Sequence, residues 1–105
     1  MSLNELIRRT WRENAEIALD LADRLVAYAA ILPADESELG DSSTRAADAA
    51  HRLAGSLGMY GLWEGSELAS LLEDQLRLRA SDLMSVSEFG RTAARLRQVI
   101  VDAEV

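Results

Sequence analysis

Apolar residues recur every three or four positions through most of this chain, which is the spacing of amphipathic α-helices. Four segments carry such a stripe: residues 3–32, 43–57, 62–79 and 85–103. The residues of the four stripes are, in chain order, Leu6, Ile7, Trp11, Ile17, Ala18, Leu21, Leu25, Tyr28, Leu32, then Ala46, Ala50, Leu53, Ala54, Leu57, then Gly65, Leu68, Ala69, Leu72, Leu76, and finally Phe89, Ala93, Leu96, Ile100, Ala103. Strand-like alternation does not persist beyond a few residues. The pattern therefore predicts an all-α fold, an antiparallel four-helix bundle with mostly short links.

Capping signals set the expected ends of the outer segments. Serine followed three residues later by glutamate, at Ser2 and again at Ser85, is the capping-box pattern of a helix start. Pro33 ends the first segment, because proline cannot continue a helix. This segment is long for a globular helix. The alternative prediction is a break near Asn14, which would give a short extra N-terminal helix followed by a longer one.

The two links around the second segment differ in character. Residues 33–43 are rich in acidic side chains and predict a solvated loop. Asp41, Ser42 or Ser43 is then the N-cap of the second helix. At its other end, residues 58–61 begin and end with glycine, which favours a helix stop and a turn because glycine readily adopts a positive φ.

Length and charge restrict the class of protein. The 105 residues predict a single domain, 1–105. The formal net charge is −7, and this argues against nucleic acid and anionic membranes as partners. No apolar run approaches the roughly 20 residues of a membrane span, and no signal peptide is visible. The absence of cysteine excludes thiol chemistry and suits a reducing cytoplasm.

The chain has a single histidine, His51, which excludes di-iron bundles and the usual catalytic zinc sites. At ~100° per residue, His51 falls about 110° from the centre of the second helix's stripe, on its flank. Its helical neighbours Ala47, Gly55 and Gly58 are small, so the imidazole stands clear and another protein surface can approach. A glycine inside a helix costs about 1 kcal/mol relative to alanine, so Gly55 calls for a reason. Tight packing inside the bundle is the alternative reason for Gly55.

Other side chains around this histidine have ordinary structural interpretations. Asp48, three residues before His51, is expected to be a solvated surface acid, with a charge that favours the imidazolium as the alternative. Trp11 and Trp63, with Met59 and Tyr60, are expected to pack in the core or against the turn. A histidine on a helix flank can itself be a plain polar surface residue.

The string from His51 to Gly61 has the form His-x-Leu-x-Gly-Ser followed by a glycine-rich turn, and an amphipathic helix with Leu72-Glu73 comes next. This string, about 25 residues long, resembles the histidine-containing phosphotransfer (HPt) domains of bacterial phosphorelays. The resemblance implies a four-helix bundle in which His51 carries a phosphoryl group. It also implies that Ala47, Gly55 and Gly58 form a docking surface for the partner.

The resemblance also implies the partners and what they supply. The expected partner is a response-regulator receiver domain, a hybrid sensor histidine kinase, or both, and the module is expected to be a cytoplasmic monomer. The receiver contributes the aspartate and Mg²⁺, so no cofactor is expected in this chain. No phosphate-binding Gly-x-x-x-x-Gly-Lys loop can occur in a chain without lysine. The module is thus expected to be a phosphocarrier and not an enzyme.

Two positions are compared individually with the family pattern. Members often have glutamine or glutamate twenty-two residues after the histidine, which here is Glu73, expected to orient the imidazole. An ordinary solvated glutamate is the alternative. Members also often have lysine three residues after the histidine, where this chain has Ala54. This departure supports a rival interpretation, a degenerate module that binds a receiver without phosphotransfer. A further rival, which does not depend on Ala54, is a purely structural bundle that pairs with a partner helix.

Overall fold

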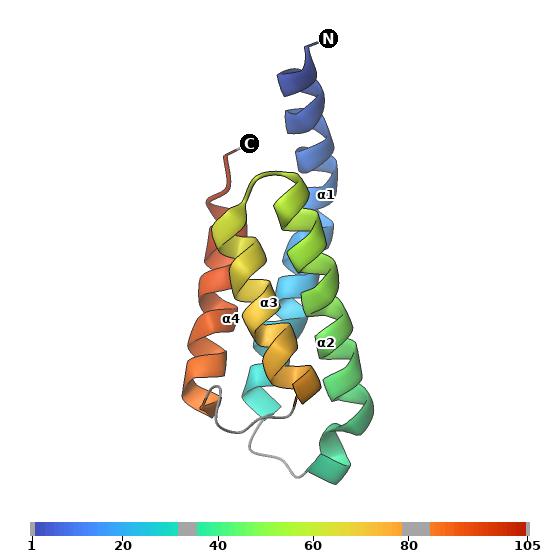
Figure 1. Ribbon diagram of the computed structural model, residues 1–105, viewed down its shortest axis with the longest axis vertical. Coiled ribbons are helices and arrows are strands. Elements are labelled where there is room, and N and C mark those ends of the chain that lie inside the picture. The colour runs from blue at the N-terminus through green and yellow to red at the C-terminus, as the bar shows by residue number, and fades with distance from the viewer. Residues whose placement is uncertain (1, 32–35, 79–84, 105) are drawn as a thin grey trace.

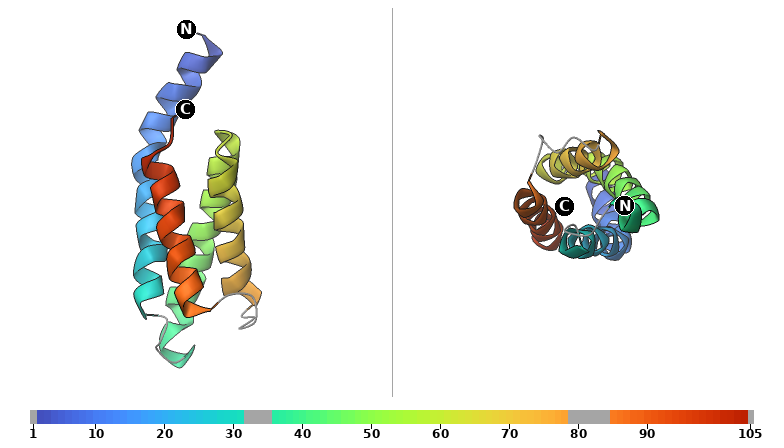
Figure 2. Two further views of the ribbon diagram at one scale, coloured as in Figure 1. Left: turned by 90° about the vertical axis from the view of Figure 1, so that its left-hand side faces the viewer. Right: turned by 90° about the horizontal axis from the view of Figure 1, so that it is seen from below.

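The computed structural model describes residues 2–31, 36–78 and 85–104, and four α-helices account for nearly all of them. In chain order these are α1 (Leu3–Ile31), α2 (Glu36–Met59), α3 (Trp63–Leu78) and α4 (Val86–Val101). Successive helices run in opposite directions, as Figure 1 shows. Each helix packs against two others, in the pairs α1–α2, α2–α3, α3–α4 and α4–α1. The view along the bundle in Figure 2 shows the resulting ring, which confirms the predicted antiparallel four-helix bundle.

The core inside this ring is built from leucine and alanine with few aromatic residues. Its largest fully buried side chains are Leu25, Leu53, Leu57, Leu72, Phe89 and Leu96. Tyr28 and Phe89 meet edge to face across α1 and α4, with ring centroids 5.8 Å apart. In the described ranges, no helix is long and apolar enough to cross a membrane.

Helix α1 is continuous, so the alternative form with a break near Asn14 is wrong. The Asn14 amide nitrogen donates to the carbonyl oxygen of Thr10, 2.8 Å away, and to the hydroxyl of Tyr60, 3.1 Å away. Asparagine often interrupts helices because its amide competes with the backbone, but these partners satisfy the amide within an intact helix.

The first turns of α1 extend beyond the end of the other three helices, as Figure 1 shows. Leu6 is therefore exposed, although the stripe predicted it to be buried. Ile17 is exposed as well, because at ~100° per residue it lies at the edge of the buried face of α1, about 80° from its centre. The predicted stripe member Leu32 and the helix-ending Pro33 lie outside the described residues.

Helix α2 begins at Glu36, so the predicted loop is wrong over residues 36–43, and the predicted N-cap at 41–43 is wrong as well. Residues 33–35 of that loop lie outside the described residues. The sequence of this segment allows both interpretations. Its acidic residues suit a solvated loop, but glutamate is also a good helix former and is favoured near the positive end of the helix dipole. Helix α4, in contrast, begins as predicted: the Ser85 hydroxyl accepts a hydrogen bond from the backbone N–H of Glu88 at 3.1 Å. The Ser2 hydroxyl accepts from Glu5 N–H in the same way.

The turn from α2 to α3 is a Schellman motif. The N–H of Leu62 donates to the carbonyl of Leu57 at 2.9 Å, and the N–H of Gly61 donates to that of Gly58 at 3.1 Å. Gly61 has φ +74°, a conformation in which a side chain would be strained. The predicted glycine turn is thus confirmed, with Gly61 as the left-handed residue. The turn sets the direction in which α3 packs antiparallel to α2.

Gly65, predicted to face inward, is buried where α3 approaches α2 and α4. A Cβ at this position would lie 2.8 Å from Leu57 Cδ1 and 3.3 Å from Val99 Cγ1. Leu57 is fully buried, so it cannot move aside freely. We expect Gly65→Ala to lower the free energy of unfolding by roughly 1–3 kcal/mol through overpacking, as measured by chemical denaturation.

Gly90→Ala is the matched control for this substitution. A Cβ at Gly90 in α4 meets its nearest atom, Ala29 Cβ, at an ordinary 3.9 Å. We expect Gly90→Ala to be neutral or to stabilise the bundle by up to about 1 kcal/mol, because alanine favours the helix. Equal effects of the two substitutions would contradict the close contact at Gly65.

Candidate functional site

His51 stands on the outer surface of α2, on the side that faces α3. Its side chain is 71% exposed, as the flank position predicted. The Nδ1 atom lies 3.0 Å from Oε2 and 3.2 Å from Oε1 of Glu73 on α3. The sequence prediction that these two side chains approach each other is confirmed. An ionised carboxylate can only accept a hydrogen bond, so in the neutral ring Nδ1 carries the proton and the lone pair of Nε2 is free.

Glu73 is only 16% exposed, yet it stays ionised at neutral pH. Burial raises the pKa of the Glu73 carboxyl, but hydrogen bonds from Arg77 and His51 outweigh burial and hold this pKa below its ordinary value. Glu73, the residue predicted to orient the imidazole, is therefore a charged hydrogen-bond acceptor. The alternative of an ordinary solvated glutamate is wrong, because its side chain is mostly buried and paired.

Arg77 is a member of this site that the sequence did not reveal. Its Nε donates to Glu73 Oε2 at 2.7 Å, and its Nη2 donates to Asp48 Oδ1 at 3.2 Å. Asp48 is exposed, as predicted, but it pairs with Arg77 and its negative charge is partly compensated. The spacing of Glu73 and Arg77, four residues apart on one helix, was the available signal. The bridge to Asp48 depends on how α2 and α3 align, which the sequence does not show.

The three small residues expected to dock a partner have different environments. Ala47 is 3% exposed and belongs to the core, so its assignment to the docking surface is wrong. Because α2 packs against both α1 and α3, its buried face is wider than the predicted stripe. Gly58 is half-buried, and a Cβ there would meet Ser66 Oγ at 3.4 Å. Gly58 therefore serves the contact between α2 and α3.

Gly55 has open space around it, unlike the other two. It is exposed one turn after His51, and a Cβ there would meet nothing within 4 Å. The alternative that Gly55 serves tight packing inside the bundle is therefore wrong. Because Gly55 has no side chain, the surface beside His51 stays uncovered.

The residue three positions after His51 offers no positive charge. The Ala54 side chain is half-buried against the core, and its carbonyl accepts a hydrogen bond from Ser66 Oγ at 2.7 Å. Residue 54 thus contributes its backbone carbonyl to the contact between α2 and α3.

The four residues expected to pack in the core or turn divide into two pairs. Trp11 is 6% exposed and meets Tyr60 edge to face at 5.2 Å, so this part of the prediction is confirmed. Trp63 is 66% exposed and Met59 is 85% exposed, so the prediction is wrong for both. Met59 is the last residue of α2 and Trp63 is the first residue of α3.

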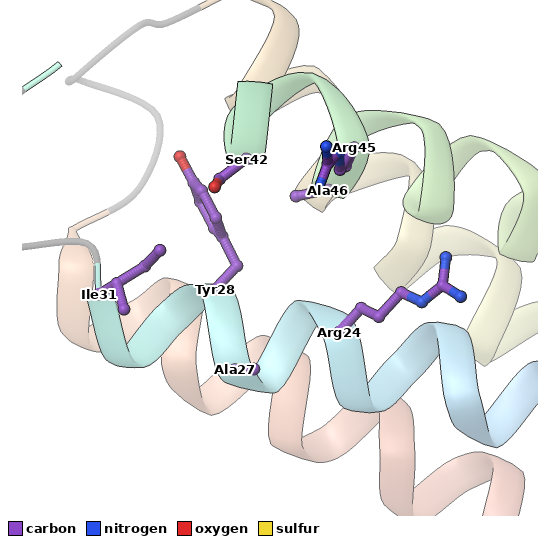
Figure 3. A pocket seen from close by; sticks show the side chains of 7 residues that line it. All are labelled: Arg24, Ala27, Tyr28, Ile31, Ser42, Arg45 and Ala46. Atoms are coloured by element: carbon purple, nitrogen blue, oxygen red, sulfur yellow. The ribbon is translucent and has the colours of Figure 1, made fainter. Parts of the chain in front are cut away.

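A hollow of about 590 Å³ lies between the C-terminal part of α1 and the N-terminal half of α2. Its lining residues, drawn in Figure 3, are Arg24, Ala27, Tyr28, Ile31, Ser42, Arg45 and Ala46. His51 and Glu73 are not among them, because they lie where α2 packs against α3. His51 is instead presented on an open helix surface, which suits a macromolecular partner better than a small ligand.

Fold and site together define a class of protein: a four-helix bundle that presents one exposed histidine, hydrogen-bonded through Nδ1 to a carboxylate of the adjacent helix. The family model of the Hpt domain matches residues 5–103, and the chain belongs to this family. Hpt domains perform histidine phosphotransfer in two-component phosphorelays, where they interact with receiver domains and kinases. No curated protein and no solved structure gives a significant match to the chain.

Proposed function

We propose that this chain is a phosphocarrier in which Nε2 of His51 accepts a phosphoryl group from the aspartyl phosphate of a receiver domain and passes it to the aspartate of another. The observation that carries the proposal is the pairing of His51 with Glu73. It leaves Nε2 as the free nitrogen on a side chain that a partner can reach. Neutral imidazole is a good nucleophile near pH 7, because its ordinary pKa is about 6.5.

The proposed transfer needs no reactant other than His51 and the aspartyl phosphate. The Nε2 lone pair attacks phosphorus, the bond from phosphorus to the aspartyl oxygen breaks, and the receiver recovers its carboxylate. The phosphorylated ring keeps its Nδ1 proton and gains positive charge, which the adjacent Glu73 carboxylate stabilises. The reverse step returns the lone pair to Nε2 when a second aspartate attacks. The phosphoryl group moves in line between two atoms, so positioning provides most of the catalysis.

The partner supplies the remaining chemistry in this proposal. The receiver domain provides the aspartate and the Mg²⁺ that stabilises the charge of the moving phosphoryl group. The chain itself acts as a monomeric cytoplasmic carrier and not as an enzyme. A hybrid sensor kinase is the proposed source of the phosphoryl group, either directly or through its own receiver.

The direct test is incubation of the purified chain with a phosphorylated receiver domain. Transfer of phosphate that is labile in acid and stable in base, as a phosphoramidate is, supports the proposal. Binding of the receiver without any labelling would instead support a degenerate module, the interpretation that Ala54 favours. A chain that neither binds receivers nor accepts phosphate would be a purely structural bundle.

The open space at Gly55 gives a test of the docking surface. We expect Gly55→Phe to leave the fold intact, because a Cβ there meets nothing within 4 Å. The phenyl ring would nevertheless hold the receiver away from His51. A misplacement of about 1 Å can cost on the order of 100-fold in rate, so we expect a loss of this order in the rate of phosphotransfer.

Ala94→Phe is the matched control, since Ala94 is an exposed position on α4, a helix that does not pack against α2. It adds the same ring and should leave the rate unchanged. A Gly55→Phe variant that accepts phosphate at the rate of the unmodified chain would exclude this surface from docking.

A further inference from the structure

The guanidinium of Arg77 joins the two helices that form the site. It contacts Glu73 on its own helix, α3, and Asp48 on α2, one turn before His51. The Glu73 oxygen that accepts from Arg77 Nε at 2.7 Å is Oε2, the same atom that lies 3.0 Å from Nδ1 of His51. Asp48, Arg77, Glu73 and His51 therefore form a continuous chain of charged contacts.

A glutamate side chain without such partners has several rotamers open to it, and most of them would point away from the imidazole. The Arg77 guanidinium is a rigid planar fork, so two carboxylates that bind it fix each other's positions. One of them, Asp48, is anchored to the same helix as His51. The Glu73 carboxylate is thus held in a fixed position relative to α2, the helix that carries His51.

We propose that Arg77 is a positioning residue for phosphotransfer: by bridging Asp48 and Glu73, it holds the Glu73 carboxylate against Nδ1 of His51 and so keeps Nε2 free. This inference rests on the proposed function, but its structural part concerns only the imidazole. Arg77 also compensates one of the two negative charges beside His51, which reduces repulsion of the incoming phosphoryl group.

Nuclear magnetic resonance of the ring nitrogens tests this role directly. The chain has one histidine, so its ¹⁵N spectrum contains a single imidazole. At a pH where the ring is neutral, we expect the unmodified chain to show the Nδ1–H form predominantly. In Arg77→Gln we expect a mixture of the two tautomers. We also expect on the order of a tenfold slower phosphotransfer, the low end of what losing an outer partner costs at histidine metal sites.

Arg97→Gln is the matched control. Arg97 on α4 pairs with Asp23 on α1 at 2.7 Å, the same distance as Arg77 to Glu73, and its side chain is 44% exposed against 46% for Arg77. It removes an equivalent ion pair between helices, away from His51. We expect its tautomer signals and transfer rate to match those of the unmodified chain.

The outcomes separate the two proposals. A mixed tautomer in Arg77→Gln, with Arg97→Gln unchanged, supports the positioning role. Unchanged tautomer signals in Arg77→Gln would overturn it, whatever the transfer rates. A chain that shows the Nδ1–H form but accepts no phosphate from receivers would overturn the proposed function and leave the positioning of the imidazole by Arg77 intact.

Discussion

We expect His51→Gln to abolish phosphoryl acceptance while the bundle stays folded. Glutamine has no nucleophilic nitrogen, because the lone pair of its amide is delocalised, so no bond to phosphorus can form. His51 is exposed, and a surface substitution of this kind should change the free energy of unfolding by no more than about 0.5 kcal/mol. The measurement is labelling by a phosphorylated receiver, together with circular dichroism during thermal unfolding.

Binding of the receiver by this variant is the internal control, since the docking surface around position 51 is retained. A variant that binds the receiver but takes no label places the acceptor at His51. Labelling at the level of the unmodified chain would show that a different side chain carries the phosphoryl group, and the proposed function of His51 would be wrong.

Glu73→Ala should be the next most damaging change at the site. It removes the acceptor of the Nδ1 proton, so the ring can rotate and exchange tautomers, and Nε2 is protonated in part of the population. We expect the rate of transfer to fall by about 10–100-fold, the range seen when partners of metal-binding histidines are lost. Glu73→Gln retains an oxygen that accepts from Nδ1 and should lose less. A rate unchanged in Glu73→Ala would exclude the orienting role.

Glu73 also gives the stability of the bundle a defined pH dependence. Its folded pKa is depressed below the ordinary value of 4.5 by Arg77 and His51, in spite of burial. A depressed carboxyl pKa stabilises the fold above the unfolded pKa, and the contribution is lost as the pH falls through the folded pKa. We therefore expect the unmodified chain to be more stable than Glu73→Gln at pH 7, and this difference to shrink below about pH 4.5.

The helices that the sequence predicted best are those with clear local signals. Ser85 caps α4 through its own hydroxyl, and Gly61 ends α2 because the turn needs a positive φ. The start of α2 at Glu36 could not be predicted, because an acidic segment suits a loop and a helix N-terminus alike. At Asn14, one of the two partners of the amide is Tyr60, which lies 46 residues away in the chain.

The site shows the same division between local and long-range information. His51 and Glu73 were predicted from a motif and a spacing, and the structure brings them together. Arg77 was missed, because its bridge to α2 depends on the register of two helices. Ala47 was misplaced, because the width of a buried helix face depends on how many neighbours cover it. Periodicity within one helix contains neither kind of information.

In the proposed function, the hydrogen bond between Nδ1 and Glu73 also determines which ring nitrogen holds the phosphoryl group. Phosphohistidine exists as two regioisomers, one for each ring nitrogen, and they differ in how fast water hydrolyses them. With Nδ1 occupied by the carboxylate, Nε2 is the nitrogen left to form the phosphohistidine in the proposed function. If the proposed function holds, the lifetime of the phosphoryl group on this chain depends on a contact between two helices.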